Sequence, residues 1–195
     1  GPVLVTSASI DWCIGENSTA NTSAAVIGTG WGNASNCYFT CSGSSYSTVV
    51  NAGNNDYLRN VRILGVTGSS GNRDGLIYSS TTTQNVYERV CIIGCGGRGF
   101  AYTGSNAGVI QRLFSCIIVG CGSDGIQFPN TATQTARTFV DRCVITGNGG
   151  YGINPGGANT NIVVTNCRLR DNTSGNFGGF GNYPTDLDNY VTDSD

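Results

Sequence analysis

The sequence predicts an all-β protein whose short strands coil into a parallel β-helix, a solenoid of about five to seven rungs with 24–29 residues each. Three observations predict this class. Apolar residues come in short bursts that glycine, asparagine, serine and threonine separate, which is typical of many short strands. Helix-forming residues are scarce, because the chain has no methionine, no lysine and only two glutamates. The third observation is a repeat with fixed internal spacing.

The repeat has four anchor positions with equivalent surroundings. An apolar side chain lies three residues before each anchor, others lie two and ten residues after it, and a cysteine or asparagine lies five residues after it. In chain order the copies are Tyr87, Val90, Ile92, Cys95 and Phe100; Leu113, Cys116, Ile118, Cys121 and Ile126; Val140, Cys143, Ile145, Asn148 and Ile153; and Val164, Cys167, Leu169, Asn172 and Phe177. An incomplete copy begins at Val61, and the anchors are 29, 26, 27 and 24 residues apart. Such units cannot bury their apolar faces alone, so the copies are expected to stack.

The domain organisation follows from where the repeat holds. Residues 1–56 do not keep its register and are expected to form irregular N-terminal rungs or a cap. Residues 57–182 form the regular β-helix. Residues 183–195 form an acidic tail, in which Asp186, Asp188 and Asp193 are candidate ligands for a weak calcium site, because calcium binds oxygen ligands.

Stacking places equivalent side chains in columns inside the solenoid. Core columns are expected for Cys116, Cys143 and Cys167 and for Cys95, Cys121, Asn148 and Asn172. The cysteines are interpreted as small buried hydrophobes, with disulfides between rungs as the alternative. Bridges between Cys13 and Cys37 or between Cys37 and Cys41 are a further alternative outside the repeat. The alternation of a strand also directs an internal aromatic stack inward, made of Tyr78, Tyr102 and Phe128.

An outward row of polar residues is expected two residues before the last apolar residue of each copy of the repeat. Its members are Asp74, Arg98, Asp124 and Tyr151. One hypothesis is a surface ion-pair ladder, in which Asp124→Asn changes stability by less than ~0.5 kcal/mol. The other is a small carbohydrate-binding site, in which charged groups bind hydroxyls and Tyr151 stacks on a sugar.

The stretch from Asp141 to Ile153, DRCVITGNGGYGI, resembles the repeats of right-handed parallel β-helix proteins. That pectate-lyase-like superfamily includes phage tailspikes and secreted β-helix proteins. The resemblance covers about residues 57–182 and implies a right-handed solenoid. It also implies either a polysaccharide-degrading enzyme or a non-catalytic shaft. The catalytic residues of pectate lyases and polygalacturonases cannot be matched here, because the chain lacks histidine and its aspartates are scattered.

Composition narrows the function further. The absence of histidine excludes Ser-His-Asp triads and histidine-ligated metals, so no cofactor is expected. Ten arginines, no lysine and a pI near 4.9 argue against nucleic acid as a partner, and the short apolar runs argue against a membrane span. The expected function is a non-catalytic extracellular structural or adhesive module of a cell surface or virion. It would assemble with further copies as an axial filament or a lateral trimer.

The alternative function is a polysaccharide-binding or polysaccharide-degrading β-helix, such as a piece of a tailspike-like enzyme. Secretion would also make asparagine sequons relevant as glycosylation candidates. These are Asn17, Asn21, Asn33 and Asn172.

Overall fold

The computed structural model describes residues 9–17, 32–41, 48–52, 56–65, 73–78, 84–103, 110–128, 137–156, 162–178 and 191–192. These segments contain β-strands and turns but no α-helix. Accordingly, no helix that could cross a bilayer occurs among them.

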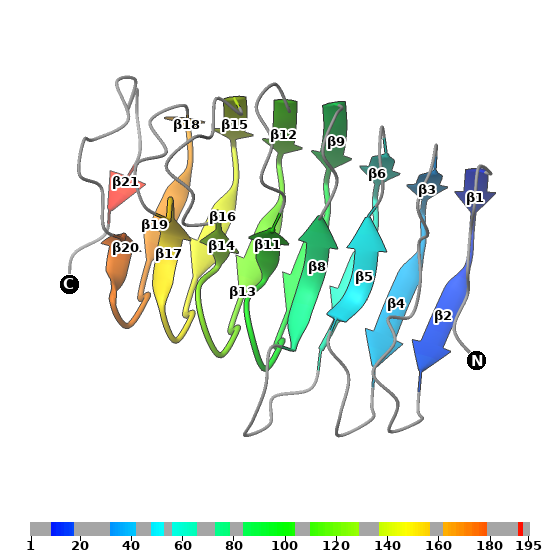
Figure 1. Cartoon of the computed structure of the whole chain (residues 1–195), viewed down its shortest axis with the longest axis horizontal. Coiled ribbons are helices and arrows are strands. Elements are labelled where there is room, and N and C mark those ends of the chain that lie inside the picture. Colours follow the sequence, from blue (N-terminus) through cyan, green and yellow to red (C-terminus); the bar gives the residue numbers. More distant parts are fainter. Residues whose placement is uncertain are drawn as a thin grey trace.

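The strands form three parallel sheets, called here A, B and C (Figure 1). Sheet A has seven strands: β1 (Ser9–Asp11), β3 (Asn33–Ser35), β6 (Tyr57–Arg59), β9 (Gln84–Glu88), β12 (Ile110–Phe114), β15 (Arg137–Asp141) and β18 (Ile162–Thr165). Sheet B has eight: β2 (Ile14–Asn17), β4 (Tyr38–Cys41), β7 (Arg62–Leu64), β10 (Cys91–Ile93), β13 (Ile117–Val119), β16 (Val144–Thr146), β19 (Arg168–Arg170) and β21 (Val191–Thr192). Sheet C has six: β5 (Thr48–Ala52), β8 (Asp74–Tyr78), β11 (Phe100–Tyr102), β14 (Ile126–Gln127), β17 (Tyr151–Asn154) and β20 (Gly175–Phe177).

Each strand pairs in parallel with the strand one turn later, so the chain is a parallel β-solenoid, as the repeat predicted. Its most regular part has about four turns, slightly fewer than the expected five to seven rungs. Those turns run from β9 to β20 and contain the four gapless sequence copies. The colours in Figure 1 follow the coil from blue strands at one end to orange strands at the other.

The described strands before residue 57 continue the same coil, so the described part of residues 1–56 forms rungs, and the register of the repeat extends into it. Tyr38 N donates to Cys13 O at 2.9 Å, and Arg62 N donates to Cys37 O at 2.9 Å. The same bond joins Ile117 N to Val90 O in the regular part. Cys13 and Cys37 therefore occupy the anchor position of two earlier turns.

A residue with positive φ makes the corner between sheets A and B in every described turn. It always directly precedes the anchor, and its φ lies between 51° and 55°. The corner residues are Trp12, Asn36, Asn60, Arg89, Ser115, Arg142 and Asn166. This left-handed conformation reverses the side-chain alternation, so the next residue points into the core. The corner after sheet B uses Gly94, Gly120, Gly147 and Asp171 in the same way.

The core is narrow and continuous along the axis. Tyr78 and Tyr102 are buried and their rings stack at 5.3 Å between centroids, with 17° between the planes. Phe128 is buried on the next turn, so the predicted internal aromatic column is confirmed. Little room remains between the sheets, since a Cβ on Gly125 would lie 2.5 Å from Ile145 Cγ2.

Candidate functional site

The cysteine and asparagine columns lie in the interior. Cys116, Cys143 and Cys167 are at most 2% exposed, and each thiol donates to backbone carbonyls. Cys95 and Cys121 are buried in the second column. No disulfide joins any of the nine cysteines in the structure. Cys91, one residue past its anchor, lies on the outer face of sheet B and is half-buried.

Asn148 and Asn172 continue the second column as a ladder of amides. Asn148 Nδ2 donates to Asn172 Oδ1 at 2.8 Å, and Asn148 Oδ1 accepts the backbone N–H of Cys121 at 3.0 Å. Asn172 Nδ2 donates to Ile145 O at 3.2 Å. Both asparagines are buried, so the ladder stabilises a corner of the interior.

The four glycosylation candidates differ in their placement. Asn172 is 8% exposed and its amide is engaged in the ladder, so the folded chain does not present it to a glycosylating enzyme. Asn33 is exposed on sheet A. Asn21 and the side chain of Asn17 lie outside the described residues, as do the calcium candidates Asp186, Asp188 and Asp193. Within the segments that the structure covers, no three acidic or cysteine side chains converge as a metal site.

The predicted polar row exists, but it is not a surface ladder. Asp74 is fully buried, and it accepts hydrogen bonds from Arg98 N at 2.8 Å and Arg98 Nε at 2.9 Å on Oδ1. Arg98 Nη2 also donates to Asp74 Oδ2 at 2.5 Å. The error has a simple cause: Asp74 is two residues from Leu76 in β8, and such residues share one face of a strand.

Asp124 repeats the arrangement two turns later. It is 5% exposed, and its Oδ1 accepts the backbone N–H of Tyr151 at 2.7 Å. Its Oδ2 accepts Asn154 Nδ2 at 2.8 Å. Tyr151 itself is half-buried. The row thus connects successive turns, and it does not present two carboxylates to a common substrate.

A glycine before each donor residue makes room for these carboxylates. A Cβ on Gly97 would lie 2.7 Å from Asp74 Oδ1, and one on Gly150 would lie 2.3 Å from Asp124 Oδ1. In the sequence, a glycine followed by the donor residue, as in Gly97-Arg98 and Gly150-Tyr151, marks a position that faces a buried aspartate of an earlier turn.

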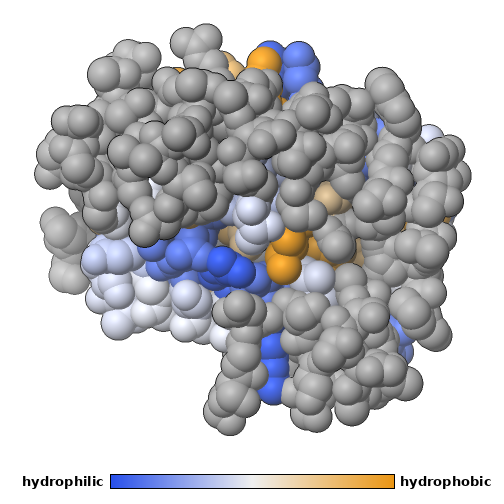
Figure 2. Space-filling model, viewed as in Figure 1, coloured by the Kyte–Doolittle hydropathy of each residue, from blue (hydrophilic) through white to orange (hydrophobic). Residues whose placement is uncertain are grey.

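The outer face of sheet C carries a polar row over the same strands. Arg98 Nη1 donates to Gln127 Oε1 at 2.5 Å, and Gln127 lies beside Asn154 in register. Figure 2 shows hydrophilic residues over β11, β14 and β17 next to a small hydrophobic area over β8. Because these polar groups hydrogen-bond one another, they form a solvated face with little free bonding capacity.

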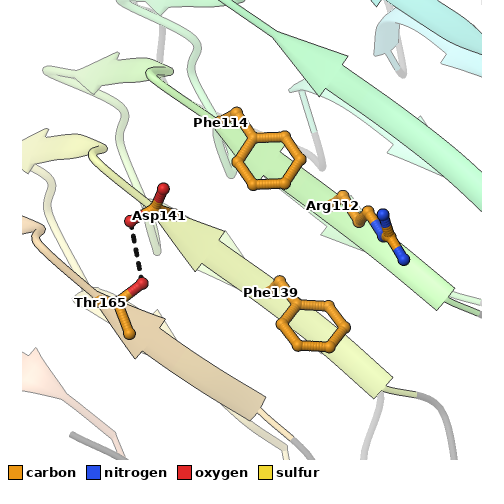
Figure 3. A pocket seen from close by; sticks show the side chains of 5 residues that line it. All are labelled: Arg112, Phe114, Phe139, Asp141 and Thr165. Carbon is orange, nitrogen blue, oxygen red and sulfur yellow. Dashed lines mark hydrogen bonds between the residues drawn. The ribbon is translucent and has the colours of Figure 1, made fainter. Parts of the chain in front are cut away.

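A different face, the outer side of sheet A, holds a hollow that the sequence did not indicate. Its volume is about 360 Å³, and we call it the sheet A hollow. Its lining residues are Arg112 and Phe114 of β12, Phe139 and Asp141 of β15 and Thr165 of β18 (Figure 3). The two phenylalanines are half-buried, and they lie over neighbouring strands.

The lining side chains are fixed by their neighbours. The Arg112 guanidinium carbon lies 5.7 Å from the centroid of the Phe139 ring, which is a cation–π contact. Asp141 Oδ1 accepts Thr165 Oγ1 at 2.9 Å and Asn166 Nδ2 at 3.0 Å. Aromatic surface and a guanidinium thus stand beside a carboxylate that is already hydrogen-bonded.

Comparisons with family models, curated proteins and solved structures found no match.

A second charged cluster lies on sheet A next to one lining residue of the hollow, Phe114. Glu88 lies beside Phe114 in register, and it accepts a short hydrogen bond from the Tyr57 hydroxyl. Arg89 Nη2 lies 2.7 Å from Glu88 Oε1 and Arg59 Nε lies 3.8 Å from Oε2. The Tyr57 hydrogen bond, followed by these arginines, lowers the pKa of Glu88. The sequence does contain a signal for the outer face of sheet A. Aromatic residues lie at outward positions two or four residues before an anchor, as Phe114 and Phe139 do.

Proposed function

We propose that this protein is a non-catalytic structural or adhesive β-solenoid module of an extracellular surface, filament or virion fibre. One observation carries the proposal: the polar residues that were candidates for a carbohydrate-binding site connect the turns of the solenoid. Asp74 and Asp124 bind groups of the following turn, and both are buried. Carboxylates held in this way stabilise a rod and do not activate a substrate.

The relationship to the pectate-lyase-like superfamily, with its right-handed coil, is part of the same proposal. The support is the repeat around Cys143 together with the parallel pairing of every turn. The proposal assigns the shaft-like role within that superfamily to this chain.

Self-assembly, as an axial filament or a lateral trimer, belongs to the proposal as well. Trp12 and Ile14, each 79% exposed, lie in the first described turn, where a further copy would cover them. On the outer face of sheet B, Cys91, Ile117 and Val144 stand in register as an apolar row. Such a row favours lateral contact between copies.

The test is the assembly state of the purified chain, measured by light scattering after gel filtration and by negative-stain microscopy. Filaments or trimers are the expected result. A monomer that releases reducing ends from a polysaccharide would overturn the proposal. Sensitivity of that cleavage to EDTA would then indicate a metal-dependent enzyme.

Polysaccharide binding without cleavage is the second candidate function, and the sheet A hollow favours it. Phe114 and Phe139 offer apolar ring surface beside Arg112. Retention of the protein in an electrophoresis gel that contains polysaccharide, with no change in polymer length, is the expected result for this function.

A further inference from the structure

The outer face of sheet B carries a column of side chains whose order is symmetric about its middle. The column takes one residue from each of seven successive strands. In register along the solenoid these are Glu16, Thr40, Leu64, Ile93, Val119, Thr146 and Arg170. On either side of the central Ile93 come an aliphatic residue, a threonine and a charged residue, and the two charges are opposite.

The side chains of this column point away from the core. Their chain neighbours Ile92 and Ile118 are at most 2% exposed and belong to the interior. Because successive residues of a strand point to opposite faces, the column faces outward. Glu16 is exposed, and the other members are half-buried.

A second outward column lies two residues earlier in each strand. Its middle member is Cys91, and Ile117 beside it is 44% exposed. The two columns together give sheet B an apolar middle, a feature that marks interaction surfaces. The members of this second column are Ile14, Tyr38, Arg62, Cys91, Ile117, Val144 and Arg168.

A two-fold axis through β10, parallel to the strands, makes this face complementary to a second copy of itself. The rotation keeps the strand direction and reverses the direction of the solenoid. An isologous contact of this kind requires that each residue match its symmetry partner. In the first column the axis pairs Ile93 with Ile93, Leu64 with Val119, Thr40 with Thr146 and Glu16 with Arg170.

Parallel arrangements do not give this match. When two or three solenoids run in the same direction at the same level, each strand faces the same strand of its neighbour. Arg168 and Arg170 of β19 would then lie beside the same arginines of the next copy, and like charges oppose association. The charges therefore favour an antiparallel pair over a lateral trimer.

The charged groups at the two ends of the column have bonding capacity for this contact. Within the described part of the chain, Glu16 forms no ion pair. Arg170 Nε lies 3.5 Å from Asp171 Oδ2. That contact leaves the N–H donors on the terminal nitrogens of Arg170 for a second carboxylate.

We propose that the outer face of sheet B binds a second copy of this chain, side by side and with the two solenoids antiparallel. Glu16 of each copy pairs with Arg170 of the other, and the apolar middle of the face is buried at the two-fold axis. Both ends of each solenoid stay free for axial contacts. The inference rests on the self-assembly part of the proposed function, and it makes the lateral contact two-fold.

Charge reversal tests the orientation of the pair. Sedimentation velocity gives the dimer dissociation constant for the unaltered chain, Glu16→Arg, Arg170→Glu and the double variant, after circular dichroism has shown that each folds. Each single change places like charges at both ends of the contact, so the dissociation constant should rise at least about tenfold. The double variant exchanges the charges and should restore pairing. Arg112→Glu, the same change at an exposed position of sheet A, should leave pairing unchanged.

Cys91 provides a second test that needs no charge variant. The axis places Cys91 opposite the same residue of the second copy, and packed sheets lie about 10 Å apart, which is beyond the reach of a disulfide. A thiol cross-linker with a spacer of about 10 Å should therefore join the copies. The reaction needs a mildly alkaline pH, because burial raises the pKa of Cys91. Peptide mapping should find Cys91 linked to Cys91, and Cys91→Ser should prevent this link.

An unaltered chain that stays monomeric at every concentration would overturn the inference. A double variant that pairs no better than the single variants would do the same. Trimers or filaments without a Cys91 link would also overturn it, while self-assembly as such would stand. The structural proposal is judged separately, from polysaccharide cleavage.

Discussion

Asp74 and Arg98 form the most buried ion pair in the described part of the solenoid, and the pair joins two successive turns. The Asp74 side chain has no exposed surface, and that of Arg98 is 19% exposed. One carboxylate thus binds the backbone and the side chain of the same residue. Arg98 lies two residues before β11, outside the strand, and the Asp74 carboxylate supplies the acceptor for its backbone N–H there.

Removing this charge should be costly. Asp74→Asn keeps the shape but turns an NH2 group toward donors, so Arg98 loses its buried counter-charge. We expect a loss of about 3 kcal/mol in the free energy of unfolding, measured by urea denaturation. Asp171→Asn is the control, because Asp171 is exposed at a corner, and it should change stability by less than about 0.5 kcal/mol. Equal stability of the two variants would contradict the structural role of Asp74.

Asp124→Asn should also lower the free energy of unfolding, as Asp74→Asn does and the control does not. The sequence alone predicted a neutral change, but Asp124 is buried and accepts two hydrogen bonds.

The sequence predicted the fold because one spacing rule governs four successive turns. It missed the earlier turns for a physical reason. Cys13 and Cys37 precede Val61 at equal spacings of 24 residues, but small residues occupy some of their core positions. Ala34 lies three residues before Cys37, and Gly15 lies two residues after Cys13. Without large apolar side chains at these positions, the periodicity is hard to recognise.

The sheet A hollow was harder to predict than the fold. Its residues come from three turns, and their proximity depends on the register between β12, β15 and β18. Sequence alternation directs Phe114 and Phe139 outward, but it does not show that Arg112 stacks on one of them. The sequence-based prediction placed Asp74 on the outer face of its strand. Asp74 and the buried Leu76 are two residues apart, however, so both side chains lie on the inner face.

Glu88 should make stability depend on pH. Its pKa is lowered, first by the Tyr57 hydrogen bond. A carboxyl group with a lowered pKa in the folded state stabilises the protein above its unfolded pKa, near 4.5, and that contribution is lost as the pH falls through the folded value. Tyr57→Phe should raise the Glu88 pKa and flatten the stability profile in this range.

Carboxyl NMR can follow this titration directly, because Glu16 is the only other glutamate in the sequence. An unchanged Glu88 pKa in Tyr57→Phe would show that the hydrogen bond does not lower it. Arg62→Gln, a charge change on another sheet, serves as the control.

The asparagine ladder predicts a second contrast in stability. Asn148→Ala leaves the buried N–H of Cys121 without its acceptor and removes a partner of Asn172. We expect a loss of about 1–3 kcal/mol in the free energy of unfolding. Asn33→Ala, on an exposed strand position, should cost less than about 0.5 kcal/mol. Similar losses in urea denaturation would contradict the ladder.

The cysteines predict a graded reactivity with iodoacetamide. Cys13 and Cys91 are half-buried, whereas the other seven are buried. Burial raises the pKa of Cys91, and burial together with a Cys37 contact raises the pKa of Cys13 to about 12. Because the thiolate is the reactive form, both should react slowly at pH 8, and faster as the pH rises toward 10. Cys143, whose pKa a Cys116 hydrogen bond and burial raise, should stay unlabelled until the chain unfolds.

Peptide mapping by mass spectrometry distinguishes these sites. In urea all nine cysteines should be labelled, because no disulfide joins them in the structure. Fewer labelled sites without a reductant would reveal disulfides between turns. Labelling of Cys143 in the folded protein at the rate of Cys91 would show that the column of anchors is open to solvent, and the solenoid core would then have to be drawn differently.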